Sequence, residues 1–500
     1  MKTFDAIIVG AGHNGLVTAA MLAKAGKSVL VLERRNVVGG ICVTEELQPG
    51  IKVNSLVSGG FLRPDITKNL DLARQGLPNT PEKSGLVSLL PAGGRLRLSN
   101  NVRETAEAIL PFSKKDADKW PDFVAFMNKA VGFLEMAYHT GMPRLPKFSV
   151  AEGIPLALLG LKLRGMGARD MYTTIRLLPM TAREFLDEWF ESDALKAAIA
   201  SLGIHNANLG VMSAGSAYNL LHQFMLRGGW GQPYASAEIG NISVALERAA
   251  RQHGAEIRLQ AEVSRILVKD NQAVGVVLAS EEQILANQVV SCLDPKRTFQ
   301  SLLEPELLDP EFGWNVRNIK MRGISAKIHL VVDEMELGAD TLVLAPSLNY
   351  LERAYDAAKY GQISEQPYME ITKSGQVVSI HLQYAPYKLK GAAWDENMRQ
   401  KIGSLAVDAL EAHFPGIKPK VRFQKVITPL DMDETYFQTE GDINHGQLML
   451  EQFFFMRPIP GWSNHRTPVS GLFLCGSGVH GGGGVSGISG RNAAEQILRG

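Results

Sequence analysis

Three glycines and an acid near the start of the chain have the types and spacing of a site that binds phosphate and ribose. Gly10, Gly12 and Gly15 follow an apolar run that ends at Val9, and Glu33 closes a second apolar run roughly 20 residues on. Gly10 permits a tight turn, Gly12 lets a pyrophosphate approach the backbone, and Gly15 lets the following helix pack closely on a sheet. A carboxylate at Glu33 can accept hydrogen bonds from an adenosine ribose. The pattern predicts a Rossmann-like dinucleotide site.

The residues that follow this acid indicate which dinucleotide binds. Glu33 favours an unphosphorylated ribose, as in FAD or NAD, whereas Arg34 and Arg35 leave a phosphorylated ribose open. Gly39 and Gly40 suit a chain that passes close to a cofactor diphosphate, as flavoproteins require. We find no second glycine fingerprint for NAD(P). The sequence therefore favours FAD, with oxygen, a quinone or another compound as the electron acceptor.

The C-terminal stretch supports the same cofactor. Residues 472–475 predict a short buried strand, nine of the twenty residues 471–490 are glycine, and 486–498 predict a helix. A glycine-rich loop that leads into a helix presents backbone N–H groups and a positive helix end. We expect this loop to hold the ribityl chain and to favour negative charge on the reduced isoalloxazine.

Composition sets limits on the protein class. The chain has 500 residues, is 45% hydrophobic and carries a formal net charge of +1. That length predicts two closely packed domains, and the near-neutral charge argues against a nucleic-acid partner. There is no apolar run of roughly 18 residues that could span a membrane, and the chain opens directly on a strand, which argues against a cleavable signal. The histidines and acids show no spacing typical of a metal site.

The cysteines favour a reducing, cytoplasmic setting. Cys42, Cys292 and Cys475 are far apart and odd in number, and they form no CxxC pair. The dithiol chemistry of glutathione-reductase-type flavoproteins is therefore excluded.

The order of predicted elements favours an α/β fold with a discontinuous FAD-binding domain of glutathione-reductase-like type. Strands return after a long helical stretch, so residues 1–75, 228–300 and 462–500 are assigned to that domain. Residues 76–227 and 301–461 are assigned to a substrate-binding domain with a mixed β-sheet and a helical cap at 140–202. Within it, apolar residues alternate with polar ones over 324–332, which predicts a half-buried strand.

The cap contains a basic, apolar segment. Between Arg144 and Arg176 the sequence has six Lys or Arg residues against two acids, and 154–161 is mostly apolar. A segment of this kind can lie peripherally in a membrane interface; the alternative is an ordinary core helix with a solvated face.

Both ends and much of the middle resemble the phytoene desaturase superfamily of FAD enzymes. The resemblance is strongest to the branch that holds desaturase-type β-carotene ketolases and pyridine nucleotide-disulphide oxidoreductase domain-containing protein 2. The matching stretches are GAGHNGL (10–16), VLERRNVVGG (31–40), EIRLQAEVSRILV (256–268), VVSCLDP (289–295), QYAPYKL (383–389), TPLD (428–431), FFFMRPIPG (453–461) and LFLCGSGVHGGGGVSGISGRNAA (472–494). The chain departs from the family at Gly481, where proline usually follows the loop histidine, and at 214–218, where Gly-Thr-Ala-Tyr is usual.

The resemblance implies non-covalent FAD, an apolar substrate tunnel under a β-rich domain, and hydride transfer from a substrate carbon to flavin N5. It assigns cofactor contact to a set of residues at both ends of the chain, with Val263 acting through its backbone on the adenine. These residues are Gly10, Gly12, Gly15, Glu33, Arg34, Gly39, Gly40, Val263, Gly476, Ser477, Val485 and Ser486.

Four residues are candidates for proton transfer or substrate positioning. His480 belongs to the loop expected to border the flavin, and the other three candidates are His445, Tyr218 and Arg457. Each has a structural alternative: His480 can hydrogen-bond backbone, His445 and Tyr218 can be satisfied wall residues, and Arg457 can fix a turn.

Three functions stay open. The first is a desaturase or oxidase of an apolar, carotenoid- or isoprenoid-like substrate. The second is an amine- or porphyrinogen-oxidase-like flavoenzyme, which calls for an aromatic cage. The third is an interaction protein whose FAD is structural. The cavity beside the flavin should distinguish them.

Overall fold

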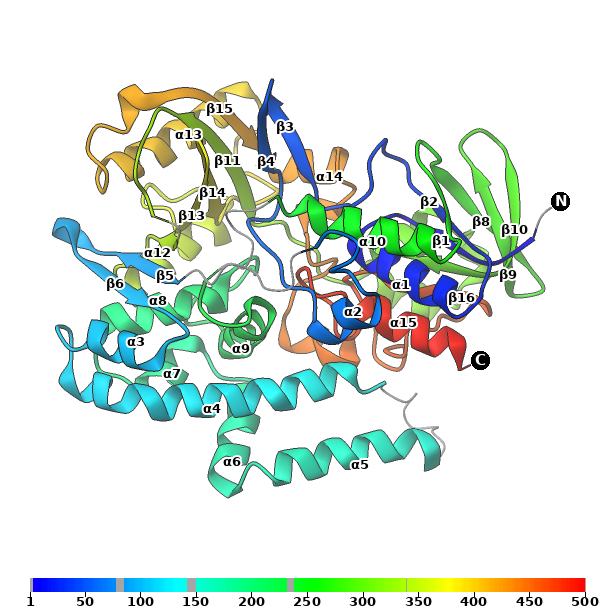
Figure 1. Cartoon of the computed structure of the whole chain (residues 1–500), viewed down its shortest axis with the longest axis horizontal. Coiled ribbons are helices and arrows are strands. Elements are labelled where there is room, and N and C mark those ends of the chain that lie inside the picture. Colours follow the sequence, from blue (N-terminus) through cyan, green and yellow to red (C-terminus); the bar gives the residue numbers. More distant parts are fainter. Residues whose placement is uncertain (1–2, 78–84, 142–149, 232–237, 339, 500) are drawn as a thin grey trace.

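The computed structural model describes residues 3–77, 85–141, 150–231, 238–338 and 340–499 (Figure 1). The described strands form two seven-stranded sheets and one two-stranded sheet. In Figure 1 the first large sheet lies on the right, the second lies at the upper left, and a layer of helices lies below the second. The predicted α/β fold class is confirmed.

The first sheet is assembled from three distant parts of the chain. Its strands run in the order β7-β2-β1-β10-β9-β8, and β16 also pairs with β10. β7, β2, β1, β10 and β16 pair in parallel, and β8 to β10 form an antiparallel meander. Parallel strands end at one edge of a sheet, where α/β folds bind ligands. The strands are β1 (Thr3–Val9), β2 (Val29–Leu32), β7 (Glu256–Arg258), β8 (Val263–Lys269), β9 (Gln272–Leu278), β10 (Gln283–Ser291) and β16 (Leu472–Leu474).

Three helices from different parts of the chain pack together beside this sheet. They are α1 (His13–Lys24), α10 (Gly240–Gln252) and α15 (Ile488–Leu498), and both α10 and α15 contact α1. A Cβ at Gly15 would collide with the Gly10 carbonyl, and one at Gly490 would collide with the Asn14 backbone. These two glycines therefore allow α1 to pack tightly on the phosphate turn and on α15.

The second sheet has the order β15-β11-β14-β13-β12-β5-β6, antiparallel except for the pair β12 and β5. Its strands are β5 (Leu86–Leu89), β6 (Arg95–Leu98), β11 (Ser325–Val332), β12 (Thr341–Val343), β13 (Met369–Ser374), β14 (Val377–Gln383) and β15 (Val421–Ile427). An apolar core joins this sheet to α13 (Glu396–Glu411). The domain boundaries given above stay a prediction, although the strands of each large sheet fall inside the ranges assigned to its domain.

The helical layer below the second sheet has its own aromatic core, which includes Trp120, Phe123 and Trp230. Its helices are α3 (Val102–Ile109), α4 (Lys114–His139), α5 (Val150–Arg164), α6 (Ala168–Leu177), α7 (Ala182–Asp187), α8 (Asp193–Ile204) and α9 (Ser216–Arg227). The remaining elements are β3 (Thr44–Gln48), β4 (Ile51–Asn54), α2 (Pro64–Asn69), α11 (Pro310–Arg317), α12 (Leu348–Lys359) and α14 (Pro429–Glu434).

The prediction of a half-buried strand over 324–332 is wrong in one respect, because every residue of β11 is buried. Its apolar side chains face the core shared with α13, as expected. Two of its polar side chains, Lys327 and His329, face the segment 55–58 instead of solvent. Lys327 Nζ donates to Ser58 Oγ at 2.7 Å, and His329 Nε2 hydrogen-bonds the Ser55 carbonyl at 3.1 Å. The polar half of β11 is therefore interior.

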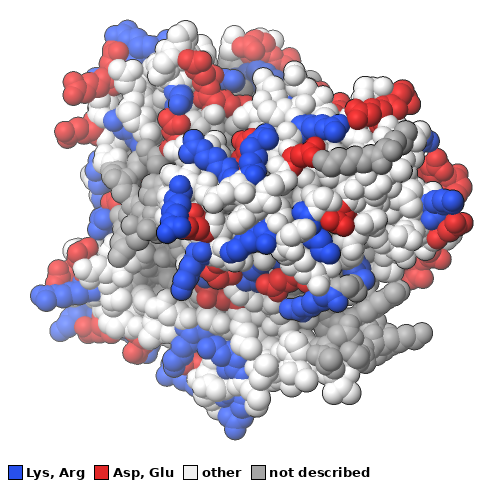
Figure 2. Space-filling view, turned by 45° about the vertical axis from the view of Figure 1, so that its right-hand side comes forward, with Lys and Arg blue, Asp and Glu red and all other residues white. Residues whose placement is uncertain are grey.

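Helix α5 projects from the bottom of the molecule with α6 beside it (Figure 1). Val150, Ile154, Leu158 and Leu161 are exposed at helical spacing along α5. None of the described helices combines the length and the hydropathy that a membrane crossing requires. On the face shown in Figure 2, basic and acidic side chains are interspersed, in keeping with the small net charge.

Candidate functional site

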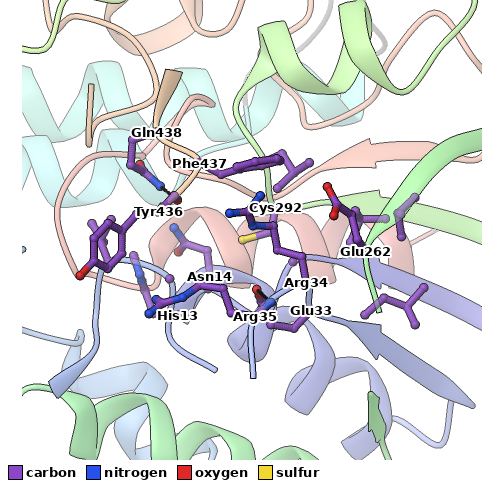
Figure 3. Close-up of a pocket in the computed structure, with 18 of the residues that line it drawn as sticks. His13, Asn14, Glu33, Arg34, Arg35, Glu262, Cys292, Tyr436, Phe437 and Gln438 are labelled. Carbon is purple, nitrogen blue, oxygen red and sulfur yellow. Dashed lines mark hydrogen bonds between the residues drawn. The ribbon is translucent and has the colours of Figure 1, made fainter. Parts of the chain in front are cut away.

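The carboxyl ends of β1, β2 and β10 open into a pocket of about 850 Å³, part of which is open to solvent. We call it the first pocket. Figure 3 shows side chains of the phosphate turn, the end of β2 and the segment 436–438 around it. Eight of the predicted site residues line it: Gly10, Gly12, Glu33, Arg34, Gly40, Val263, Ser477 and His445.

Glu33 is 7% exposed and is fixed by the backbone of the phosphate turn. Its two oxygens accept hydrogen bonds from Ala11 N at 2.8 Å and from Arg35 N at 2.9 Å. A carboxylate has about four acceptor positions, so two stay available for a ribose diol. This geometry fits the predicted ribose contact.

The phosphate turn fits a pyrophosphate. Gly12 is the N-cap of α1 and has no side-chain cap, so the first N–H groups of that helix lack a side-chain acceptor. Gly39 N donates to the Ala11 carbonyl at 2.8 Å, which holds the second glycine pair against the turn. Gly40 has a φ of +61°, and a Cβ there would lie 3.3 Å from Gly12 Cα. A side chain at Gly40 would therefore crowd the backbone that must face the phosphates.

Arg34 connects the end of β2 to the segment 434–437. Its Nη2 donates to the carbonyls of Glu434 and Thr435, both at 3.2 Å, and its guanidinium lies 3.7 Å from the centre of the Phe437 ring. Burial lowers the Arg34 pKa from its ordinary value. Arg34 lines the first pocket and at the same time joins β2 to the segment 434–437. The resemblance implied only the cofactor contact.

The C-terminal loop closes the pocket from another side. A Cβ at Gly476 would lie 2.7 Å from the Cys292 carbonyl, so the loop passes directly over the end of β10. Ser477 Oγ accepts a hydrogen bond from Asn14 Nδ2 at 3.4 Å. The carbonyls of Val485 and Ser486 accept from Phe61 N and Arg63 N, each at 3.1 Å. Four predicted site residues do not line the first pocket but support the residues that do: Gly15, Gly39, Gly476 and Ser486.

Two buried histidines face the first pocket with an unpartnered nitrogen each. His445 Nε2 hydrogen-bonds Gln438 Oε1 at 3.1 Å, while His445 Nδ1 and His13 Nε2 lack a partner among the described residues. Burial lowers the pKa of both imidazoles to about 4, so both are neutral near pH 7. Buried polar atoms without a partner fit a pocket that binds a polar ligand.

Arg457 lies behind the pocket and lines none of the described pockets. Its Nη2 donates to three carbonyls, those of Asn444 at 2.7 Å, Ser477 at 3.0 Å and Gly446 at 3.3 Å. The guanidinium thus ties the segment around His445 to the C-terminal loop. This placement makes Arg457 a positioning residue.

Tyr218 on α9 and His480 in the C-terminal loop are both buried, and they line none of the described pockets. Tyr218 forms a very short hydrogen bond to Tyr138, whose hydroxyl also lies 2.8 Å from His222 Nδ1. His480 Nε2 hydrogen-bonds the Ala137 carbonyl at 2.9 Å, near the end of α4. His480 thus ties the C-terminal loop to α4, whereas Tyr218 packs against Phe453 and Phe454, and both contacts agree with the structural alternative given for each residue.

A second pocket of about 550 Å³, a volume that includes space open to solvent, adjoins the first. Ile41 lines both, and Ile443 and Asn444 of the second pocket precede His445 of the first. Gly484 and Val485 of the C-terminal loop form another wall. The second pocket therefore lies between the phosphate-binding domain, the helical layer and the β11 sheet.

The residues that sequence reasoning missed are the charged side chains of this second pocket. Lys327 of β11 and Arg227 at the end of α9 line it, together with His205. Lys327 is 3% exposed, and burial lowers its pKa to about 8. Arg227 Nη2 donates to Glu370 Oε2 at 2.9 Å, and His205 Nδ1 lies 3.5 Å from the same oxygen. The alternation of polar residues in β11 was the available signal.

Comparison with known families identifies one match that covers almost the whole chain. The sequence profile of the family described as flavin containing amine oxidoreductase matches residues 15–498.

Among curated relatives, pyridine nucleotide-disulfide oxidoreductase domain-containing protein 2 of Rattus norvegicus is 33% identical, over 99% of this chain and 93% of that protein. A limonene dehydrogenase protein of Castellaniella defragrans is 23% identical over 100% and 95% of the two chains. The neurosporene-forming phytoene desaturase of Cereibacter sphaeroides is 23% identical over 97% and 92%. The resemblance to the phytoene desaturase superfamily is thereby confirmed.

Solved structures share the fold. An oxidoreductase from Methanosarcina mazei superposes with a TM-score of 0.60 at 17% identity, over 99% of this chain and 100% of that chain. A putrescine oxidase variant gives a TM-score of 0.60 at 16% identity, over 99% of both chains. The predicted cofactor, FAD, is confirmed by the family, and the first pocket has the acid, the glycines and the free helix N-terminus that FAD requires.

Proposed function

This chain belongs to the flavin containing amine oxidoreductase family, and from that premise we propose that it is a desaturase- or oxidase-type enzyme acting on a largely apolar, isoprenoid-like substrate. FAD, when bound, supplies the acceptor for a hydride taken from a substrate carbon. The protein must bind the substrate, orient its C–H bond and exclude water.

The observation that carries this proposal is that the two pockets share part of their walls. Ile41 contributes to both, and the segment 443–445 runs from one to the other. A cofactor whose ribose and phosphates occupy the first pocket would extend toward the second along these shared walls. The third function, in which FAD is structural, requires a flavin that no cavity reaches. The pocket beside the proposed cofactor site argues against this function.

The apolar part of the second pocket supports a hydrocarbon substrate. Six aliphatic side chains line it: Ile41, Leu56, Val57, Leu226, Ile443 and Val485. Two relatives are named for limonene and phytoene, which are isoprenoids. We extend that substrate class, not the individual compounds, to this chain.

Amine oxidation is the second candidate, because the structural neighbours include putrescine oxidase. Two features of the second pocket disfavour it. Lys327 and Arg227 place positive charge where a substrate ammonium would have to bind. None of the described residues that line the pocket is Phe, Tyr or Trp, whereas cation binding in such sites uses the faces of these rings.

The exposed apolar stripe of α5 supports the peripheral membrane contact considered above. Ile154, Leu158 and Leu161 are 55%, 49% and 66% exposed, and the exposed side chains of Lys162 and Arg164 follow on the same helix. An apolar stripe beside basic residues favours binding to an anionic lipid surface. Such a surface would also hold the proposed apolar substrate.

Compound classes can be compared directly on the FAD-loaded protein under anaerobic conditions. Matched C10 compounds with one isoprenoid chain, namely limonene, geraniol, geranic acid and geranylamine, are added while the flavin band near about 450 nm is followed. We expect bleaching by one or more of the non-amine compounds. Bleaching by geranylamine or putrescine alone would favour the amine oxidase function, and bleaching by dithionite only would overturn the proposal for this substrate class. Mixing the reduced protein with oxygen or a soluble quinone then identifies the electron acceptor.

A further inference from the structure

The positive and negative charges around the second pocket are not equal in number. Lys327 and Arg227 both line the pocket and are 3% and 5% exposed. Glu370, 1% exposed, is the acid beside them. His205 and His381 complete the cluster, with ring centres 4.6 Å apart, and burial lowers the pKa of both, so they are neutral near pH 7. Among the described residues of this cluster, one positive charge is therefore left over.

Several hydrogen-bond donors of this cluster also have no acceptor among the described residues. Arg227 Nε and Nη1 lack a hydrogen-bond partner among the described residues, and only Nη2 bonds Glu370. Lys327 Nζ has three hydrogens, and its bond to Ser58 uses one of them. Buried charges in proteins are normally paired, and buried donors are normally satisfied. An anion that accepts hydrogen bonds would balance the surplus positive charge and would satisfy the free donors.

We propose that the second pocket binds a carboxylate group of the substrate between Lys327 and Arg227. The substrate is then an apolar, isoprenoid-like acid whose hydrocarbon part lies against the aliphatic wall. A carboxylate carries one negative charge, which matches the one surplus positive charge, and its two oxygens suit a guanidinium and an ammonium group. This inference rests on the proposed function, because it assumes that the substrate enters the second pocket.

The carboxylate has a place in the pocket that is separate from the cofactor phosphates. The phosphate turn belongs to the first pocket, on the far side of Ile41 from Lys327. No Asp or Glu is among the described residues that line the second pocket, so no acid on its wall opposes an anionic ligand. Glu370 acts from behind Arg227.

Binding to the oxidised FAD-loaded protein tests this inference without turnover. Geranic acid, geraniol and geranylamine are titrated by calorimetry and by the change in the flavin spectrum. We expect geranic acid to bind at least about tenfold more tightly than geraniol, and geranylamine to bind most weakly. Lys327→Met should weaken the binding of geranic acid by at least about tenfold and should leave the affinity for geraniol unchanged. Lys425→Met, on the exposed face of the neighbouring strand β15, is the matched control and should change neither.

A second variant tests the inference without replacing Lys327 or Arg227. Glu370→Gln removes the competing negative charge with little change of shape, so it should tighten geranic acid binding. Equal binding of acid and alcohol, or an unchanged acid affinity in Lys327→Met, would overturn the inference. If Lys327→Met shifts the flavin reduction potential but leaves the affinity for the acid unchanged, the Lys327 charge stabilises the reduced cofactor and does not bind the substrate. If geranic acid binds as expected but nothing bleaches the flavin, the proposed oxidation fails while the carboxylate site stands.

Discussion

Lys327 Nζ and Ser58 Oγ, 2.7 Å apart, connect the second large sheet to the segment that follows β4, at the wall of the second pocket. Lys327 comes from the middle of β11, and Ser58 follows β4 in the N-terminal part of the chain. The bond places a buried ammonium group between β11 and the N-terminal part of the chain. The charge of that group is central to how we expect the site to recognise its ligand.

The pH dependence of acid binding should follow Lys327. Burial lowers its pKa to about 8, Glu370 opposes that shift, and Arg227 adds to it. Lys327 is therefore charged below about pH 8 and loses its proton above it, while the neighbouring His205 and His381 stay neutral throughout. Geranic acid affinity should be constant from about pH 6 to 7 and should fall as pH rises through about 8. Titration calorimetry across this range checks the expectation, with geraniol as the uncharged control; an acid affinity that does not change up to about pH 10 would contradict it.

Glu33 should control cofactor affinity. Glu33→Ala removes the acceptor of the Ala11 and Arg35 N–H groups and the acid assigned to the ribose. Losing hydrogen bonds to a charged group should weaken FAD binding by roughly 10- to 100-fold. Fluorescence titration of the cofactor-free protein with FAD measures the effect. Glu281→Gln, at an exposed turn after β9, serves as the control and should bind FAD like the unmodified protein; a Glu33→Ala protein that also does so would refute the assignment.

His445 and His480 should respond differently to the same substitution. His445 lines the first pocket and has a φ of +55°, which asparagine tolerates, so His445→Asn should change FAD affinity with little loss of stability. His480 Nε2 is bonded to a buried carbonyl, so His480→Asn should lower the free energy of unfolding by about 1–3 kcal/mol and leave FAD affinity unchanged. Denaturant unfolding and FAD titration separate the two. The opposite pattern would place His480 among the residues that face the cofactor.

The stripe on α5 should govern lipid binding. Serine at Ile154, Leu158 and Leu161 together should abolish co-sedimentation with vesicles of phosphatidylcholine and phosphatidylserine. Serine at Leu110, Val244 and Leu259, which are also exposed but lie elsewhere, should leave it intact. Because all six side chains are exposed, neither variant should change thermal stability greatly. Equal vesicle binding by both triple variants, or none by the unmodified protein, would argue against a membrane contact.

The cofactor half of the site could be predicted from the sequence because its signals are local. Gly10, Gly12, Gly15 and Glu33 lie within one strand-helix-strand unit, and their spacing alone fixes how they meet. The C-terminal glycines could be added because they follow a short strand, and that strand does join the same sheet through β10. Here the prediction needed only the preference of each residue for a turn or a helix start.

The substrate half could not be predicted in the same way, because its residues meet only through tertiary contacts. The alternation in β11 correctly separated Ala326 and Ile328 from Lys327 and His329. It could not show that another domain covers the polar face, since a strand facing solvent has the same pattern. His480 was expected to border the flavin because it belongs to the C-terminal loop, and its bond to the end of α4, like the bond of Tyr218 to Tyr138, forms only in the folded chain.

The most direct test of the proposed function is to fill the second pocket and ask whether substrate still reduces the flavin. Leu226→Trp narrows this pocket from α9, and Leu389→Trp makes the same change in a separate surface pocket beside α13. Both FAD-loaded variants are mixed anaerobically with the compound that bleaches the unmodified protein, and dithionite then checks that the flavin is reducible. We predict that Leu226→Trp binds FAD and is reduced by dithionite but not by substrate, while Leu389→Trp behaves like the unmodified protein. Unchanged substrate reduction in Leu226→Trp would contradict the assignment of the second pocket as the substrate site.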